Sequence, residues 1–245
     1  MRGTVQGVGF RPFIFREATG RQLGGWGVNT ADGVTIEVEG DQARIIDFAK
    51  AIRWTAPGAA RVASLEPIDI PPTGETAFTI RSSETGKRPS TEVPADLATC
   101  QKCLAEMNDP GDRRYRYPFI NCTECGPRYS IIVDMPYDRD RTSMRSFAMC
   151  LECQIEYDDP ADRRFHAEPI ACPRCGPHLT LWDAVGSPGE IGDAALKAAA
   201  DAIRDGRIVA VKGIGGFHLL CDARNEAAVA RLRMKKRRET KPLAV

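Results

Sequence analysis

"CTECGP" at residues 122–127 returns as "CPRCGP" at residues 172–177, fifty residues later. Each stretch follows another Cys-x-x-Cys pair, so the cysteine pattern is CxxC-x18-CxxC-x24-CxxC-x18-CxxC. The surroundings repeat as well, because DPGDRRYRYP at 109–118 is similar to DPADRRFHAEP at 159–169. These matches indicate an internal duplication with a period of fifty residues.

The eight cysteines of these pairs have the spacing of zinc ligands. Zinc prefers four thiolates in a tetrahedron, and one Cys-x-x-Cys turn lets two thiolates share an ion. The duplication favours two ions, each bound within one repeat, although the four pairs could be divided in three ways; unmetallated core or disulfide cysteines are the alternative. Sites of this kind, with no open coordination position, are structural. The predicted ligands are Cys100, Cys103, Cys122, Cys125, Cys150, Cys153, Cys172 and Cys175.

The composition is that of a globular protein. Of 245 residues, 42% are apolar and 27% charged, and the 34 Lys and Arg nearly balance the 33 Asp and Glu. This balance gives no overall attraction to nucleic acid or to an anionic membrane, and no apolar run reaches the roughly 18 residues of a membrane helix. Nine cysteines without a secretory signal favour reduced metal ligands and indicate the cytoplasm. With eight cysteine ligands available, we expect His166 and His178 at the surface.

The pattern outside the cysteines predicts an α+β chain of several domains. Residues 1–82 read as βαββαβ, the order of a ferredoxin-like sandwich, with one helix from about Pro12 to Gly24 and another over Gln42–Trp54. Residues 83–95 are polar, contain two prolines and are typical of a linker. Residues 96–185 form the duplicated cysteine module.

Residues 189–245 return to alternating helix and strand patterns. An alanine-rich amphipathic helix is expected over residues 193–205. The apolar stretch IVAV at 208–211 indicates a strand, and Asn225 is the expected N-cap of a second helix. The final KPLAV looks like the opening of another strand, so we expect this chain to be part of a longer polypeptide.

The stretch VQGVGFRPF at 5–13 places Gly7 and Gly9 directly before a helix start, with Arg11 just inside it. Backbone N–H groups in such a turn, together with the positive helix end, can bind an anion. Asn29 adds a polar residue at the end of the next strand, where an apolar one would be expected. A glycine turn before a helix is more often only a turn, so these residues alone leave both interpretations open.

The same residues carry a resemblance, because GTVQGVGFRPF followed by GWGVNTADGVTIEVEG is similar to the signature of the acylphosphatase family over residues 1–82. The resemblance implies that Arg11 and Asn29 are catalytic: Arg11 grips the phosphoryl group, and Asn29 orients the attacking water. No side chain looks like a general base, which fits substrate-assisted hydrolysis. The first strand is shorter than the family's, so we expect it to be truncated. The implied substrate-binding residues are Gly7, Val8, Gly9, Phe10 and Arg11.

The C-terminal segment resembles the opening part of the YrdC/Sua5 family of nucleotide-binding domains, through DGRIVAVKGIGGFHLL at 205–220 and KKRRETKP at 235–242. The resemblance implies that Lys236, Arg238 and Lys241 contact the phosphates of ATP, with Mg²⁺ as its expected companion. On charge alone, the basic run could equally be a solvated helix end.

The three segments in this order resemble the HypF family of carbamoyltransferases in [NiFe]-hydrogenase maturation. The resemblance implies that carbamoyl phosphate is cleaved in the first domain and that ATP converts the carbamate to carbamoyl adenylate in the YrdC-like domain. A further domain, which is absent from this chain, would then transfer the carbamoyl group to the C-terminal cysteine of HypE.

Two other functions remain open from the sequence. A zinc ribbon that binds nucleic acid could use the clusters at 113–115 and 163–165, but the near-zero net charge and the acidic residues beside them argue against it. Those arginines are expected to pair with neighbouring carboxylates or to line a surface between domains. A stand-alone acylphosphatase with passive appendages is the second alternative.

Overall fold

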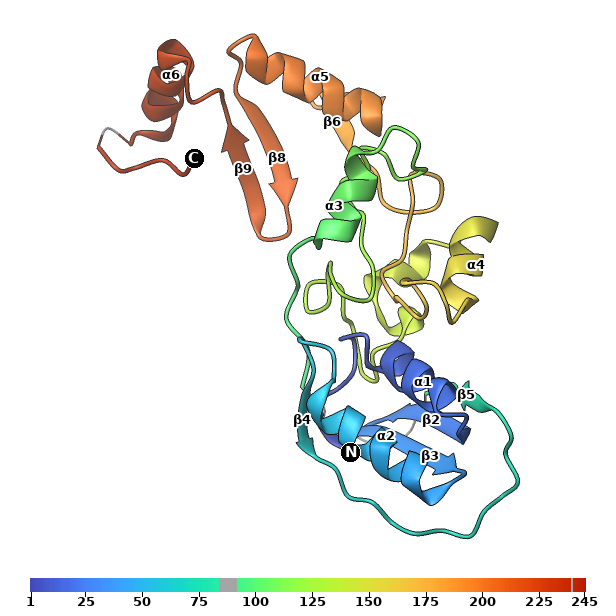
Figure 1. Cartoon of the computed structure of the whole chain (residues 1–245). Coiled ribbons are helices and arrows are strands. Elements are labelled where there is room, and N and C mark those ends of the chain that lie inside the picture. Colours follow the sequence, from blue (N-terminus) through green and yellow to red (C-terminus); the bar gives the residue numbers. More distant parts are fainter. Residues whose placement is uncertain (84–91, 239) are drawn as a thin grey trace. The chain divides into compact units, whose positions relative to one another are not determined.

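The structure is a computed structural model that describes residues 1–83, 92–238 and 240–245 (Figure 1). The chain forms two compact units, Met1–Pro177 and His178–Val245. The cysteine module therefore shares a unit with the N-terminal segment. Most of the predicted linker at 83–95 lies outside the described residues, and the predicted domain boundaries stay predictions.

The helices and strands follow the labels of Figure 1. The strands of the first unit are β1 (Arg2–Thr4), β2 (Gly24–Thr30), β3 (Gly33–Glu39), β4 (Arg61–Ser64) and β5 (Phe78–Ile80). Its helices are α1 (Phe10–Gly20), α2 (Gln42–Trp54), α3 (Gln101–Asn108) and α4 (Leu151–Asp158), with the 3-10 turns η1 (Arg139–Arg141) and η2 (Ser143–Ser146). The second unit contains β6 (Thr180–Trp182), β7 (Pro188–Ile191), α5 (Asp193–Arg204), β8 (Val209–Gly213), β9 (Gly216–Leu220) and α6 (Glu226–Lys236).

The N-terminal segment has the predicted ferredoxin-like order of elements. Strand β2 pairs antiparallel with β3 and parallel with β5, while β1 pairs antiparallel with β4. Met1 joins the two sheets, because its carbonyl accepts from the Val34 N–H and its amino group donates to the Val34 carbonyl, both at 3.1 Å. Strand β1 has only three residues, in agreement with the short first strand that the sequence predicts.

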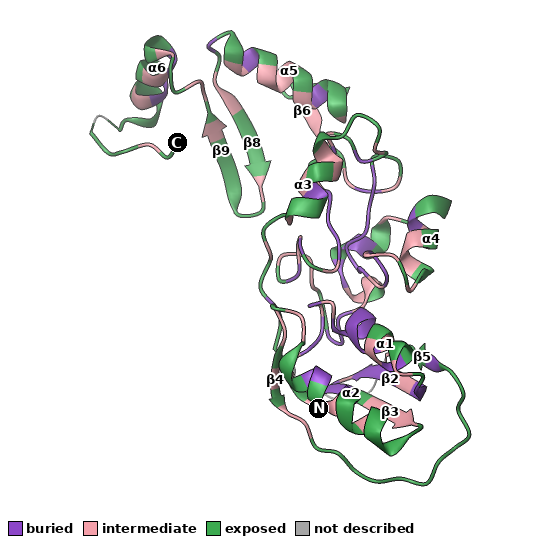
Figure 2. Ribbon diagram, in the orientation of Figure 1, coloured by how far each residue is buried: buried purple, intermediate pink, exposed green. Residues whose placement is uncertain are grey.

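Helices α1 and α2 cover one face of this sheet (Figure 1) and bury an apolar core against it. Phe13 and Ile14 of α1 meet Phe48 and Ile52 of α2 there, and all four side chains are buried. Figure 2 shows buried residues on both helices. Burial of side chains of this size stabilises the fold by about 1.5–3 kcal/mol each. The core fixes the start of α1, where the glycine loop lies.

The predicted end of the first helix was wrong by four residues. Helix α1 stops at Gly20, and the chain reverses through Gln22, which adopts a left-handed φ of 55°. The Leu23 N–H then donates to the Ala18 carbonyl at 3.0 Å, which satisfies the helix end. Gly24, the predicted end of the helix, is instead the first residue of β2, and Gly25 follows it there.

The cysteine module has little regular structure. Helices α3 and α4 have eight residues each, and they occupy equivalent places in the two repeats. Neither was predicted, because a helix of about two turns carries too few apolar positions to show periodicity. The buried cysteines, with Tyr117, Ile120 and Ile170, form the small cores of the repeats.

Each repeat contributes an arginine that bonds a glutamate of the other repeat. Arg114 of the first repeat bonds Glu156 of the second and donates to the Ala171 carbonyl at 2.9 Å. In return, Arg164 of the second repeat bonds Glu106 of the first. Both arginines are almost fully buried. The prediction that these arginines pair with neighbouring carboxylates was wrong in its partners, because the glutamates that they bond lie in the opposite repeat.

Replacing Arg114 with methionine should destabilise this module strongly. The Arg114 side chain is 2% exposed, and its loss would leave the Glu156 carboxylate without this partner, at a cost of about 3 kcal/mol in the free energy of unfolding. Chemical denaturation of zinc-loaded protein measures the change. The matched control is Arg174→Met, which breaks an exposed pair with Glu152 and should leave the denaturation midpoint unchanged. Equal midpoints for both variants would contradict the expectation.

The second unit contains two hairpins and two helices. Strands β6 and β7 form one antiparallel pair, and β8 and β9 form the other. Asn225 caps α6, since its side chain accepts from the Ala228 N–H at 3.0 Å. The prediction of a strand at KPLAV was wrong, because residues 241–245 have no regular structure. Among the described residues, no helix is both long and apolar enough to cross a bilayer.

Candidate functional site

The glycine loop turns sharply into α1. Gly7 and Gly9 have φ values of 70° and 74°, a left-handed conformation that glycine adopts without steric cost. Gly9 caps α1 and offers no side chain, so the first N–H groups of the helix have no side-chain cap. The Val8 and Phe10 side chains lie in the core. Any ligand at this loop would therefore meet backbone N–H groups rather than these side chains.

Arg11 is buried and bonded to the cysteine module. It is 8% exposed, and its Nη1 donates to Asp138 Oδ1 at 2.9 Å. Its Nη2 donates to the Tyr137 carbonyl at 3.2 Å and to Glu168 Oε1. Burial alone would lower the pKa of Arg11, but the Glu168 and Asp138 carboxylates outweigh burial and raise it. The guanidinium is therefore a fixed positive charge.

Asn29 has a buried amide with no partner. Its side chain lies on β2 with 0% exposure, and both Oδ1 and Nδ2 lack a hydrogen-bond partner among the described protein atoms. Leaving a buried amide unpaired costs about 1–3 kcal/mol in the free energy of folding. A buried polar group without a partner therefore suggests a role in function. No hydrogen bond joins Asn29 to Arg11 in the described part of the chain.

Gln6 and Arg128 tie the loop to its surroundings. Gln6 Nε2 donates to the Thr30 carbonyl at 2.8 Å, next to Asn29, and Gln6 Oε1 accepts from the Tyr137 N–H at 3.0 Å. Arg128 is buried and donates to the Gly7 carbonyl at 2.5 Å and to the Thr123 carbonyl at 2.8 Å. Sequence reasoning missed both residues, since each makes hydrogen bonds to backbone groups far away in the chain, at Tyr137 for Gln6 and at Gly7 for Arg128.

A cavity lies between the loop and the cysteine module. The N-terminal segment contributes one wall and the two cysteine repeats the other. The cavity is thus built by both parts of the first unit. The lining includes Gly7, Gly9, Arg11, Thr123, Tyr137, His166 and Glu168.

His166 was expected at the surface, and this was wrong. It is half-buried beside Arg11, its Nδ1 atom has no protein partner among the described residues, and its ring lies 4.5 Å from that of Phe165. Burial and then the Arg11 charge lower the pKa of His166 from 6.5 to about 3. The imidazole is therefore neutral at physiological pH. His178 is exposed, as expected.

The neutral His166 should make stability fall in mild acid. The pKa of His166 is lower in the folded chain than in the unfolded chain, so below about pH 6.5 the unfolded chain binds a proton that the folded chain does not bind. The free energy of unfolding therefore decreases as pH falls below about 6.5. Between about pH 7 and 5.5 the loss is about 1 kcal/mol. His166→Asn removes the titration and tolerates the left-handed φ of 52°. Urea denaturation at both pH values should show the loss in wild type only; an equal loss in His166→Asn would contradict it.

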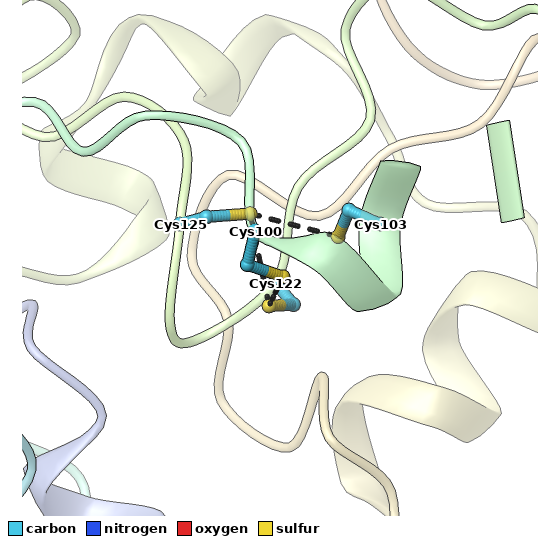
Figure 3. Close-up of side chains that lie close together, drawn as sticks. All are labelled: Cys100, Cys103, Cys122 and Cys125. Carbon is cyan, nitrogen blue, oxygen red and sulfur yellow. Dashed lines mark hydrogen bonds between the residues drawn. The ribbon is translucent and has the colours of Figure 1, made fainter. Parts of the chain in front are cut away.

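The eight predicted ligands form two clusters, one in each repeat. Within each cluster the four sulfur atoms lie within 4.8 Å of one another. In the first, shown in Figure 3, the neighbouring Sγ–Sγ distances are 3.8, 3.8 and 3.5 Å. In the second they are 3.7, 3.7 and 3.6 Å. None of the eight cysteines forms a disulfide.

This geometry fits zinc. A tetrahedron with zinc–sulfur distances of about 2.3 Å has edges of about 3.8 Å, close to the observed spacings. Two sulfurs come from the start of a helix, as Cys100 caps α3 and Cys103 lies in its first turn (Figure 3). The others come from the loop at CTECGP, where Gly126 has a φ of 97° and closes the turn. Each site can hold one ion with no open position, as structural zinc requires.

The predicted ATP-phosphate residues lie at the end of α6. Lys236 is its last residue, and Arg238 and Lys241 follow it; all three are exposed. The Arg233 side chain donates to the carbonyls of Arg238 and Lys241, at 3.3 and 3.0 Å, and so shapes this loop. The role of Lys236, Arg238 and Lys241 in binding phosphate stays a prediction.

Three protein families match separate parts of this chain. Residues 1–80 match the family described as acylphosphatase, residues 99–132 and 149–182 match the HypF finger, and residues 201–245 match the family described as telomere recombination. An acylphosphatase of Moorella thermoacetica is 43% identical over 84 residues, which are 34% of this chain and 89% of that protein. The N-terminal segment therefore belongs to the acylphosphatase family.

Similarity to longer proteins covers the whole chain. Carbamoyltransferase HypF of Synechocystis sp. is 52% identical over 245 residues, which are 100% of this chain and 32% of that protein. A crystal structure of full-length HypF in the phosphate- and nucleotide-bound form matches with 46% identity and a TM-score of 0.88, over 99% of this chain and 32% of that one. The chain belongs to the HypF family, and it spans about a third of the length of the curated relatives it matches.

Proposed function

We propose that this chain carries the site at which a HypF-type carbamoyltransferase cleaves carbamoyl phosphate. The relatives that match the whole chain are named carbamoyltransferases, and the N-terminal segment belongs to the acylphosphatase family. The observation that carries the proposal is the pair of buried polar groups in that segment. Arg11 is a fixed cation just inside α1, and the Asn29 amide is buried without a partner among the residues that the structure describes.

The proposed reaction needs no protein base. Backbone N–H groups from Gly7 to Arg11 and the Arg11 guanidinium would hold the phosphoryl oxygens and stabilise the charge that develops there. The Asn29 amide would hold a water molecule in line with the phosphorus. The water oxygen bonds to phosphorus as the phosphorus–oxygen bond to the carbamoyl group breaks. A proton of the water passes to a phosphate oxygen, and the products are carbamate and dihydrogen phosphate.

The zinc ions would have a structural role in this proposal. Each four-cysteine cluster would hold one ion and supply folding energy to a repeat that has only a small apolar core. The folded repeats in turn present Asp138, Tyr137 and Glu168 to Arg11.

ATP and an acceptor protein belong to later steps of the proposed sequence. The related full-length HypF was crystallised in a phosphate- and nucleotide-bound form, and residues 201–245 match a family that includes YrdC-type domains. Lys236, Arg238 and Lys241 would contact the phosphates of ATP, with Mg²⁺. ATP would convert carbamate to carbamoyl adenylate. The carbamoyl group would then pass to the C-terminal cysteine of HypE, in the cytoplasm.

A comparison of two phosphate compounds tests the substrate class. Purified chain should release phosphate from carbamoyl phosphate but not from an alkyl phosphate such as glycerol phosphate, because the site offers cations and donors for a phosphoryl group but no acid to protonate an alkoxide leaving group. Similar rates on both compounds, or none on carbamoyl phosphate, would contradict the proposal. ATP should not be required for this step.

The nucleic-acid alternative has little support. The arginines that it would need, Arg113, Arg114, Arg163 and Arg164, are bound to Glu156 and Glu106 across the two repeats. Guanidinium groups paired in this way release few counterions on binding a phosphate backbone.

A further inference from the structure

The position of Arg11 is set by the cysteine module and not by its own domain. Its bonded partners are Asp138 and Tyr137, between the two repeats, and Glu168 of the second repeat. These partners lie more than a hundred residues further along the chain. The hydrogen bonds to these described residues use three of the five N–H groups of the guanidinium, so two donors remain for a ligand.

Glu168 is built into the second repeat. Its carboxylate is 1% exposed, and besides Arg11 it accepts from the Arg139 N–H and from the Tyr157 hydroxyl, both at 2.9 Å. Tyr157 belongs to α4, which starts at the zinc-ligand pair Cys150 and Cys153. The carboxylate therefore has one orientation, and the fold of the second repeat determines it.

We infer that Glu168 and Asp138 are positioning residues, which orient Arg11 and so complete the acylphosphatase site from the cysteine module. This inference rests on the proposed function. A free arginine side chain has several rotatable bonds, and fixing it in advance removes an entropic cost from the transition state. Displacement of a catalytic group by about 1 Å can cost about a hundredfold in rate. The site is thus complete only when the second repeat is folded.

The two carboxylates should favour the reaction step but disfavour the binding of phosphate, and both effects can be measured. They place negative charge beside the group that would hold a phosphoryl dianion, so they weaken its binding while they orient Arg11. Removing one charge should therefore lower kcat and at the same time leave the affinity for inorganic phosphate unchanged or higher. General damage to the fold would lower both.

The experiment uses the full chain with the variants Glu168→Gln and Asp138→Asn. Phosphate release from carbamoyl phosphate should fall about 10- to 100-fold in kcat, while the inhibition constant of inorganic phosphate stays the same or decreases. Asp138 is 26% exposed, so its variant keeps the test informative if Glu168→Gln fails to fold. Zinc content and circular dichroism check the fold of each variant.

The matched control is Glu92→Gln. This exposed carboxylate also accepts a hydrogen bond from the N-terminal segment, from the Thr4 hydroxyl at 2.6 Å, but it does not contact Arg11. Its variant should keep the wild-type kcat. Added guanidinium gives a second readout: it should restore activity to Arg11→Ala, and it should fail to do so when Glu168→Gln is also present.

The outcomes separate this inference from the proposed function. If Arg11→Ala is inactive while Glu168→Gln and Asp138→Asn keep the wild-type kcat, the inference is wrong and the proposed function stands. A higher kcat in either carboxylate variant would also overturn it, because the carboxylates would then be blocking Arg11. If Arg11→Ala itself is as active as wild type, the proposed function fails.

Discussion

Arg11→Ala is expected to lower the rate of phosphate release from carbamoyl phosphate about a thousandfold. A buried guanidinium aimed at a phosphoryl group stabilises the charge of the transition state, and loss of such a group costs about 10³-fold or more. Arg11→Lys should recover little of the activity, because an ammonium group cannot bond Asp138, Tyr137 and Glu168 with the same planar geometry. Asn29→Ala should lower kcat about a hundredfold with a small change in KM.

Steady-state kinetics with a coupled phosphate assay measures these effects. Arg16→Ala is the matched control, since Arg16 lies on the same helix but is exposed. It should keep the wild-type kcat and KM. Equal activity of Arg11→Ala and Arg16→Ala would show that Arg11 has no part in the reaction.

Removal of zinc should unfold the cysteine module. Structural zinc with four thiolates contributes about 10–16 kcal/mol of binding energy per site, which is as large as the whole stability of a typical domain. The small cores of the two repeats, centred on the cysteines themselves, cannot replace it. Cys103→Ser and Cys153→Ser should each reduce the zinc content from two ions per chain to one.

The ninth cysteine supplies the control for this prediction. Cys221 lies outside both clusters, in the second unit, and Cys221→Ser should keep two zinc ions. Atomic absorption and near-ultraviolet circular dichroism, before and after treatment with a strong chelator, report metal content and packing. Native packing in the chelated protein would contradict a structural role for zinc.

Local signals made much of the fold predictable. Helix α2 runs from Gln42 to Trp54 as expected, because Asp41 caps its first N–H groups and one face carries Phe48 and Ile52. The cysteine spacing predicted the metal clusters because ligands of one zinc must come from short turns. The end of α1 depended on a left-handed turn at Gln22, which the residue type does not favour.

The partners of Arg11 could not be predicted from the sequence. Glu168 is brought to Arg11 by the packing of the cysteine module against the N-terminal segment, and no local pattern encodes that contact. One signal was present in the duplication. Glu168 stands where the first repeat has Pro118, within a run of four positions, 116–119 and 166–169, at which the two repeats share no residue. A local difference between two otherwise similar repeats can indicate a residue that contacts a part of the chain outside its own repeat.

The most direct test of the account is hydrolysis of carbamoyl phosphate in ¹⁸O-labelled water. The Arg11→Ala variant supplies the background of spontaneous decomposition. We expect the wild type to release phosphate far faster than this variant, and each phosphate so formed to carry one ¹⁸O atom, because the water held by Asn29 attacks phosphorus. Equal rates in the two proteins, or unlabelled phosphate from the wild type, would contradict the account.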